Sequence, residues 1–186
     1  MLTGRDRVLI ALFLLVNVGV VVAVIMFKDS GSDDGSDEAG DRTLRAGRVV
    51  ANRAIGASIR PPRGWTRQPA RRAIVFRSPE SSTIMSISHP PGAVSSRTVL
   101  GTAVDAIRRG YRDVRVRRTS GKVAGLPAVS RVVSATNTKG VRLNVLVSAA
   151  QGRRRAWLVQ VFSGPVARLK RLPEAQAALG TLRLRG

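Results

Sequence analysis

Residues 57–68 read ASIRPPRGWTRQ, and this stretch decides how the chain begins to fold. Residues 55–59 have the composition of a short strand, which two prolines end because proline has no N–H to join a strand ladder. Gly64 permits the tight backbone of the turn that follows. Trp65 is expected to be buried where the chain turns, and the alternative is an exposed platform on which a ligand stacks. The predicted structural corner therefore consists of Pro62, Gly64 and Trp65.

Strand-like runs separated by turn residues continue from this corner. The sequence predicts strands over residues 73–77, 83–88, 114–118, 128–135, 141–149 and 156–163. Alternation in TIMSIS, residues 83–88, places Ile84 and Met85 on opposite faces of its sheet. NTKG and QGRRR are typical of hairpin turns between the last three strands. Because these strands are apolar on nearly both faces, their sheet needs cover on both sides.

Two segments have a helical pattern. The first begins at Thr98 as the expected N-cap and ends at Gly110 as the expected C-terminal cap. Its apolar stripe consists of Leu100, Val104, Ile107 and Tyr111. The second spans residues 165–182, where Pro173 either bends the helix or starts a second segment. Strands joined by short hairpins, with helices inserted between them, indicate an α+β fold. We expect an antiparallel sheet of about six to seven strands flanked by helices.

The corner SIRPPRGW, the later VFRSPESS and the GLPA of residues 125–128 together resemble PsbP/DcrB-like domains. The resemblance covers roughly residues 50–184. It implies an antiparallel sheet between helices, a domain often tethered outside a bacterial membrane, and accessory, assembly or binding roles without a shared catalytic centre. No functional residue is carried over from the family, and the strong basicity of this chain departs from the family pattern.

The first 45 residues predict a membrane attachment. Residues 8–27 carry no charge, and a helix of that length rises about 30 Å, the thickness of a bilayer hydrocarbon core. Phe27 is followed directly by Lys28 and Asp29 without a small-residue cleavage site, so we expect an uncleaved transmembrane helix after a cytoplasmic tail of residues 1–7. Basic residues on its two sides are nearly balanced. A short N-terminal tail usually stays inside, which favours an extracytoplasmic C-terminal domain at the cell membrane.

Residues 28–45 form a predicted acidic, disordered linker, with six acids between residues 29 and 41. It is either a solvated spacer or a screen for the basic domain of residues 46–186. Residues 42–186 contain 29 Lys/Arg and four Asp/Glu, the other three basic and seven acidic residues lying before them, which gives a net charge of +25. Such a charge attracts polyanions.

The sequence offers little for catalysis. It has no cysteine, one histidine (His89) before a Pro-Pro pair, and none of the common nucleophile, metal or phosphate-loop motifs. We therefore expect a protein that is not an enzyme and needs no cofactor or metal.

Basic clusters remain as candidate anion-binding sites. They lie at a hairpin tip, on one strand and on the final helix: Arg153, Arg154, Arg155; Arg115, Arg117, Arg118; and Arg168, Lys170, Arg171. The expected partners are anionic lipid headgroups, anionic wall polymers or an acidic envelope protein. The alternative is a cytoplasm-facing, membrane-anchored domain that binds nucleic acid. The sequence shows no helix-turn-helix and few aromatic residues, which makes nucleic acid the less favoured partner.

Overall fold

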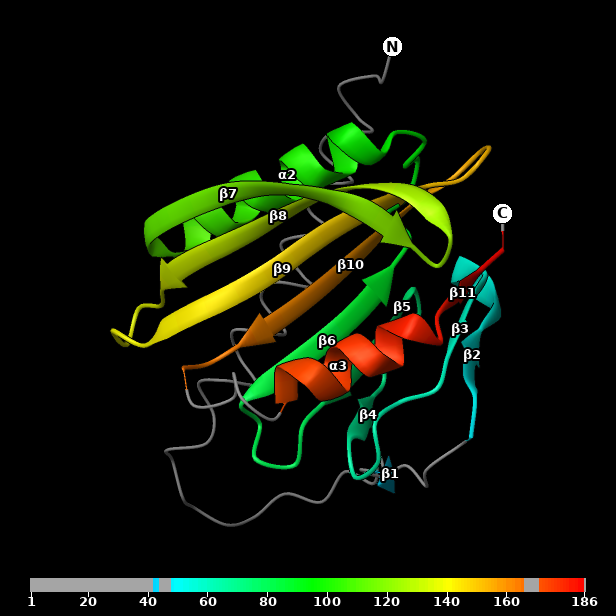
Figure 1. The fold of residues 1–186 in the computed structure, drawn as a ribbon, viewed down its shortest axis with the longest axis horizontal. Helices are drawn as coiled ribbons and strands as arrows, with labels where there is room; N and C mark the ends of the chain where they lie inside the picture. The colour runs from blue at the N-terminus through cyan, green and yellow to red at the C-terminus, as the bar shows by residue number, and fades with distance from the viewer. Residues whose placement is uncertain (1–41, 44–47, 166–170, 186) are drawn as a thin grey trace.

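A computed structural model describes residues 42–43, 48–165 and 171–185. The described residues contain no helix that is long and apolar enough to cross a membrane. The predicted transmembrane helix of residues 8–27 and nearly all of the predicted acidic linker lie outside them. The described part has an α+β fold, which confirms the predicted fold class for the domain (Figure 1).

The main sheet has eight strands, and every neighbouring pair is antiparallel. Seven of them have three or more residues. Six of the eight match predicted strands, whereas the sequence predicted neither the two-residue edge strand β1 nor the three-residue strand β4. In spatial order the strands are β1 (Arg42–Thr43), β4 (Thr66–Gln68), β5 (Ala73–Arg77), β6 (Thr83–Ser88), β10 (Ala156–Ser163), β9 (Arg142–Gln151), β8 (Leu126–Thr136) and β7 (Arg112–Val123).

The predicted first strand does not belong to this sheet. Residues 53–55 form a 3-10 turn, in which the Asn52 side chain accepts a hydrogen bond from the Ala54 N–H. Gly56 then adopts a left-handed conformation with φ of 62°. Only β3 (Ala57–Ile59) continues as a strand, and it pairs with β2 (Val50–Asn52) and β11 (Arg183–Leu184) in a separate three-stranded sheet. The prediction of one strand over residues 55–59 in the main sheet was therefore wrong.

Helix α2 (Ser96–Gly110) confirms the predicted stripe and corrects its ends. All four stripe residues are buried. The N-cap is Ser95, whose hydroxyl accepts a hydrogen bond from the Thr98 N–H, so Thr98 itself lies inside the first turn. Gly110 is the last helical residue and not a left-handed cap, because the chain passes directly into extended Tyr111 and strand β7.

Helix α3 (Arg171–Gly180) is shorter than the predicted helical segment, of which residues 166–170 lie outside the description. Pro173 occupies its first turn, where a proline is tolerated because the N–H that it lacks has no partner there. The two predicted hairpin turns are present between β8, β9 and β10. A third hairpin joins β7 to β8 through Ala124 and Gly125, both at positive φ as a type I′ turn requires.

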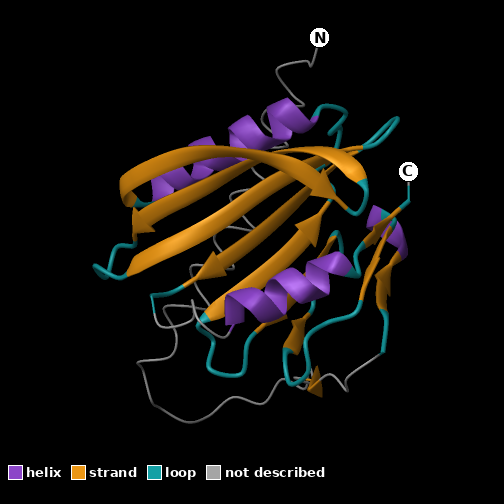
Figure 2. Cartoon of the chain, viewed as in Figure 1, coloured by secondary structure: helices purple, strands orange, loops and turns teal. Residues whose placement is uncertain are grey.

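The main sheet lies between two layers. Helix α2 covers one face over β7 to β10, while α3 and the small sheet cover the other face near β5, β6 and β10 (Figures 1 and 2). Two hydrophobic cores result, one on each face. Ile84 belongs to the α2 core and Met85 to the α3 core, as their alternation predicts. The predicted need for cover on both sides of the central strands is thus met.

Candidate anion-binding site

The tip of the β9–β10 hairpin presents arginines to solvent. Arg153 and Arg154 are exposed, whereas Arg155 is half-buried with its guanidinium beside Gly56. The turn is tight: the Gly152 N–H donates to the Arg155 carbonyl at 2.8 Å, and a Cβ on Gly152 would lie 2.7 Å from the ring of Trp157. That ring is fully buried, and its Nε1–H donates to the Ile55 carbonyl at 2.7 Å. Two of the three predicted tip arginines, Arg153 and Arg154, are therefore exposed on a hairpin turn whose backbone is held by these contacts.

Strand β7 separates its three predicted arginines between two faces of the sheet. Val114 and Val116 pack against the α2 core, so by alternation Arg118 faces the α2 side while Arg115 and Arg117 face away. Arg118 lines a groove beneath α2. Arg115 instead lines a second cavity, with Asp113 and Arg142 among its other residues. The three arginines predicted to act together on this strand are thus divided between the two faces of the sheet, and Arg118 and Arg115 line different cavities.

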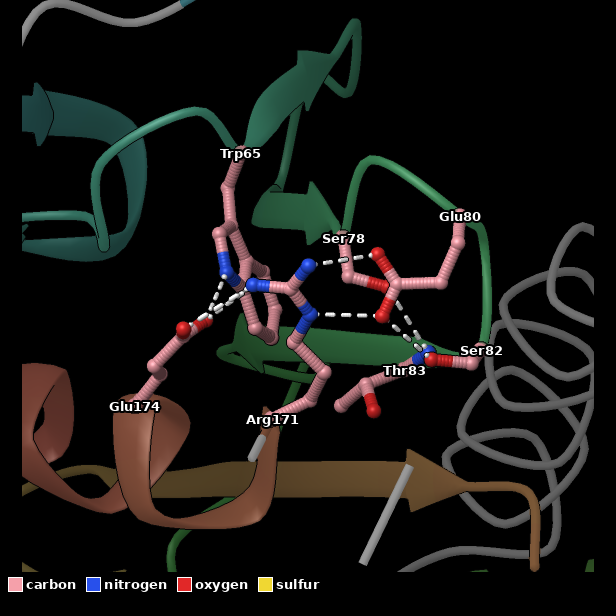
Figure 3. Close-up of polar contacts among 7 residues, drawn as sticks. All are labelled: Trp65, Ser78, Glu80, Ser82, Thr83, Arg171 and Glu174. Atoms are coloured by element: carbon pink, nitrogen blue, oxygen red, sulfur yellow. Dashed lines mark hydrogen bonds and ion pairs between the residues drawn. The ribbon is translucent and has the colours of Figure 1, made fainter. Parts of the chain in front are cut away.

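Arg171 is engaged by carboxylates and leaves the set of candidate anion-binding residues (Figure 3). Its Nη2 donates to Glu80 Oε2 at 2.8 Å, and its Nη1 donates to Glu174 Oε1 at 2.9 Å. Only 16% of its side chain is exposed. The predicted neighbours on this segment, Arg168 and Lys170, lie outside the described residues.

Arg171, Glu80 and Glu174 form a polar cluster with Trp65, the tryptophan of the opening stretch. Trp65 is fully buried in the α3 core, and its Nε1–H donates to Glu174 Oε2 at 2.9 Å (Figure 3). An indole with no exposed surface cannot stack on a ligand, so the alternative of a ligand platform is wrong. Hydrogen bonds from Arg171 hold the pKa of Glu80 at about 2. The cluster joins the proline–glycine–tryptophan corner, the turn before β6 and the start of α3.

Two further polar side chains of the described residues, His89 and Tyr111, are partly or fully buried. His89 is partly buried, with Nδ1 3.0 Å from the Ala156 carbonyl oxygen. Burial raises the pKa of Tyr111 to about 12, which keeps its phenol neutral. Among residues 48–165 and 171–185, no three His, Cys, Asp or Glu side chains are grouped so that they could hold a metal ion.

Solved structures resemble this chain in fold. The cyanobacterial PsbP (CyanoP) of Synechocystis sp. PCC 6803 covers 83% of this chain with all of its own length, at 14% identity and a TM-score of 0.55. The fold is PsbP-like. The resemblance read from the corner and turn motifs is confirmed at this level.

Two further solved structures match this chain at low sequence identity. A protein of Bacteroides thetaiotaomicron VPI-5482 matches 72% of this chain at 12% identity with a TM-score of 0.50, over 46% of its own length. LpqN of Mycobacterium tuberculosis, described as involved in cell envelope biogenesis, matches 83% of this chain at 14% identity, with 87% of its own chain covered. The TM-score of that match is 0.41. No family model matches the sequence, and no curated protein matches it.

Sequence reasoning named one arginine of the groove beneath α2, Arg118, and missed the other three. Arg97 and Arg131 line it together with Arg108 and Arg118. One signal was present, because Arg131 interrupts the otherwise apolar and small residues of AVSRVVSA in the predicted strand 128–135. Arg97 stands alone before the helical stripe, and nothing in its neighbourhood distinguishes it from an ordinary solvated arginine.

Proposed function

We propose that this PsbP-like domain is a non-enzymatic, membrane-tethered extracytoplasmic module that binds anionic groups of the cell envelope. The observation that carries the proposal is the imbalance of charge on its surface. Of its four carboxylates, Glu80 and Glu174 pair with Arg171 and Asp105 pairs with Arg108. The exposed arginines of the hairpin tip and of β7 then face solvent in a domain of net charge +25.

Guanidinium groups suit phosphate-bearing partners. Each arginine presents several N–H donors in a planar fork that matches phosphate and carboxylate oxygens. Anionic lipid headgroups and phosphate-bearing wall polymers both offer such oxygens, and an acidic envelope protein offers carboxylates. Lipid headgroups are the first partner to test, because the predicted helix of residues 8–27 would keep the domain beside a bilayer. Nucleic acid becomes the relevant partner only if the domain faces the cytoplasm.

Vesicle binding tests the basic surface. A chain truncated to residues 42–186 is expected to bind vesicles that contain phosphatidylglycerol, and to lose affinity steeply as salt rises, since exposed charges are screened beyond about 8–10 Å at physiological ionic strength. The double variant Arg153→Gln/Arg154→Gln should bind about 5- to 30-fold more weakly, because each basic side chain near an anionic bilayer contributes on the order of 1 kcal/mol.

The matched control is Arg109→Gln/Arg112→Gln, which removes the same charge from exposed positions far along the chain from the hairpin. Its affinity should fall much less than that of the tip variant. Equal losses in the two variants would show that only total charge matters. Binding to phosphatidylcholine vesicles as tight as to anionic vesicles, without salt dependence, would contradict the proposal.

Membrane attachment and topology have their own test. The full chain is expected to remain with membranes after an alkaline carbonate wash, because about twenty uncharged residues suffice to span a bilayer. In spheroplasts, added protease should degrade the C-terminal domain. A domain protected until the cells are lysed would support the cytoplasm-facing alternative, and a soluble species beginning near Asp29 would contradict the anchor.

A further inference from the structure

A groove separates helix α2 from the outer strands of the sheet. It has a volume of ≈ 460 Å³, within the range of about 300–1,000 Å³ that is usual for small-molecule sites. Its apolar lining comes from Leu100 and Val104 on α2, Val116 on β7 and Val129 on β8. Four arginines surround this apolar lining, two on the helix and two on the sheet: Arg97, Arg108, Arg118 and Arg131.

The two sheet arginines are direct cross-strand partners. Arg118 of β7 pairs in register with Arg131 of β8, and both side chains line the groove. Like charges placed directly opposite on neighbouring strands destabilise a sheet. Asp105 is the single acidic residue that lines the groove, and it pairs with Arg108 at 3.3 Å. An oxyanion between Arg118 and Arg131 would therefore remove a repulsion that the groove's own residues leave in place.

Gly101 keeps the groove open on the helix side. It lies in the middle of α2, where glycine is a poorer helix former than alanine. Its lack of a side chain is not required by packing, because a Cβ built there meets nothing within 4 Å. Gly101 also lines the groove. The open space beside Gly101 belongs to the groove and is available to a ligand.

We propose that this groove binds an organic anion, a phosphate or carboxylate group attached to an apolar chain. The guanidinium groups of Arg118 and Arg131 hold the anionic group. Arg131 Nη1 donates to the Ser130 carbonyl at 2.8 Å, so Arg131 would bind the anionic group through its Nε and Nη2. The apolar part lies along Val116, Val129 and the α2 side chains beneath. Arg97 and Arg108 stand about three turns apart on α2, roughly 16 Å along its axis, and flank the two ends. This site is separate from the hairpin tip and binds one small molecule, not a surface.

Calorimetry with octyl phosphate tests the site. The full-length chain is placed in nanodiscs of phosphatidylcholine, and empty nanodiscs supply the blank. Octyl phosphate is expected to bind with a one-to-one stoichiometry and at least 10-fold more tightly than inorganic phosphate, which lacks the chain. Octyl glucoside, which carries the same chain on a neutral head, should not bind measurably. Octyl phosphate no tighter than inorganic phosphate would overturn the apolar part of the proposal.

Variants that remove the same charge distinguish binding in the groove from nonspecific electrostatic attraction of the anion to the basic domain. Arg118→Gln should weaken octyl phosphate binding 10-fold or more, while Arg117→Gln, the neighbouring residue on the opposite face, should change it less than 2-fold. Gly101→Leu, which removes no charge, should abolish binding by filling the groove. Equal effects of Arg117→Gln and Arg118→Gln would overturn the site. So would unchanged binding in Gly101→Leu; if that variant does not fold, the Arg117/Arg118 pair decides alone.

Discussion

Replacing Trp65 with alanine is expected to lower the free energy of unfolding by about 3–5 kcal/mol, the range for a large aromatic side chain removed from a core. The indole has no exposed surface and packs in the α3 core among residues such as Ile59 and Phe76. Its loss would leave a cavity where the small sheet, the main sheet and α3 meet. Urea unfolding of residues 42–186, followed by far-ultraviolet circular dichroism, measures the change.

Trp65→Phe divides this loss between volume and hydrogen bonding. Phenylalanine keeps most of the apolar contact but cannot donate to Glu174 Oε2. We expect it to cost about 1.5–3 kcal/mol, since one hydrogen bond to a charged group and part of a ring are lost. A loss below about 1 kcal/mol in Trp65→Ala would show that the corner is not a core element of this fold, whatever its burial.

Much of the fold could be predicted because the strands of the sheet centre carry strong local signals. Strands β5, β6 and β10 have the predicted bounds, since each is a β-branched or apolar run bounded by turn residues. The burial of Trp65 could be predicted for the same reason, because two prolines and a glycine beside an aromatic residue indicate a turn that ends a strand.

The small sheet shows what local signals miss. Residues 57–59 alternate like any strand, and their partner depends on Arg183 and Leu184 at the other end of the chain. Residues 55 and 56 do not continue this strand, because the Asn52 side chain caps a 3-10 turn over residues 53–55 and Gly56 has a left-handed conformation. Nothing in the local sequence pattern indicates either feature. A pattern of apolar residues predicts a strand but not the sheet to which it belongs.

The basic residues were the hardest to interpret, because exposure and pairing depend on contacts between distant segments. Arg171 looks like its basic neighbours in sequence, yet Glu80 lies 91 residues away and reaches it through the fold. Arg118 and Arg131 meet only because β7 and β8 pair in one register. Charge composition predicted an anion-binding surface, whereas the division into paired, exposed and groove-lining arginines came from the structure.

The second large effect is expected at Arg171. Replacing it with glutamine removes the guanidinium that joins Glu80 to Glu174 and should lower the free energy of unfolding by about 1–3 kcal/mol. Losing one partner of a fully buried pair costs about 3–5 kcal/mol. The value here is smaller because 42% of the Glu80 side chain is exposed and water can solvate it. Arg108→Gln is the control: its pair with Asp105 is more than half exposed on both sides and should contribute less than about 1 kcal/mol.

Lowering the pH should destabilise the protein through the same ion pairs of Arg171 with Glu80 and Glu174. The pKa of Glu80 lies at about 2 in the folded protein against an ordinary value of 4.5, so the folded state binds this proton less readily than the unfolded state. The pairing therefore contributes its full stability above about pH 4.5 and loses it progressively as pH falls toward 2. Urea midpoints of the parent chain should fall over this interval. In Arg171→Gln the main cause of the low pKa is absent, so its midpoints should fall less steeply. Parallel curves for the two chains would mean that Arg171 does not set the pKa of Glu80, and that the cluster is held by packing alone.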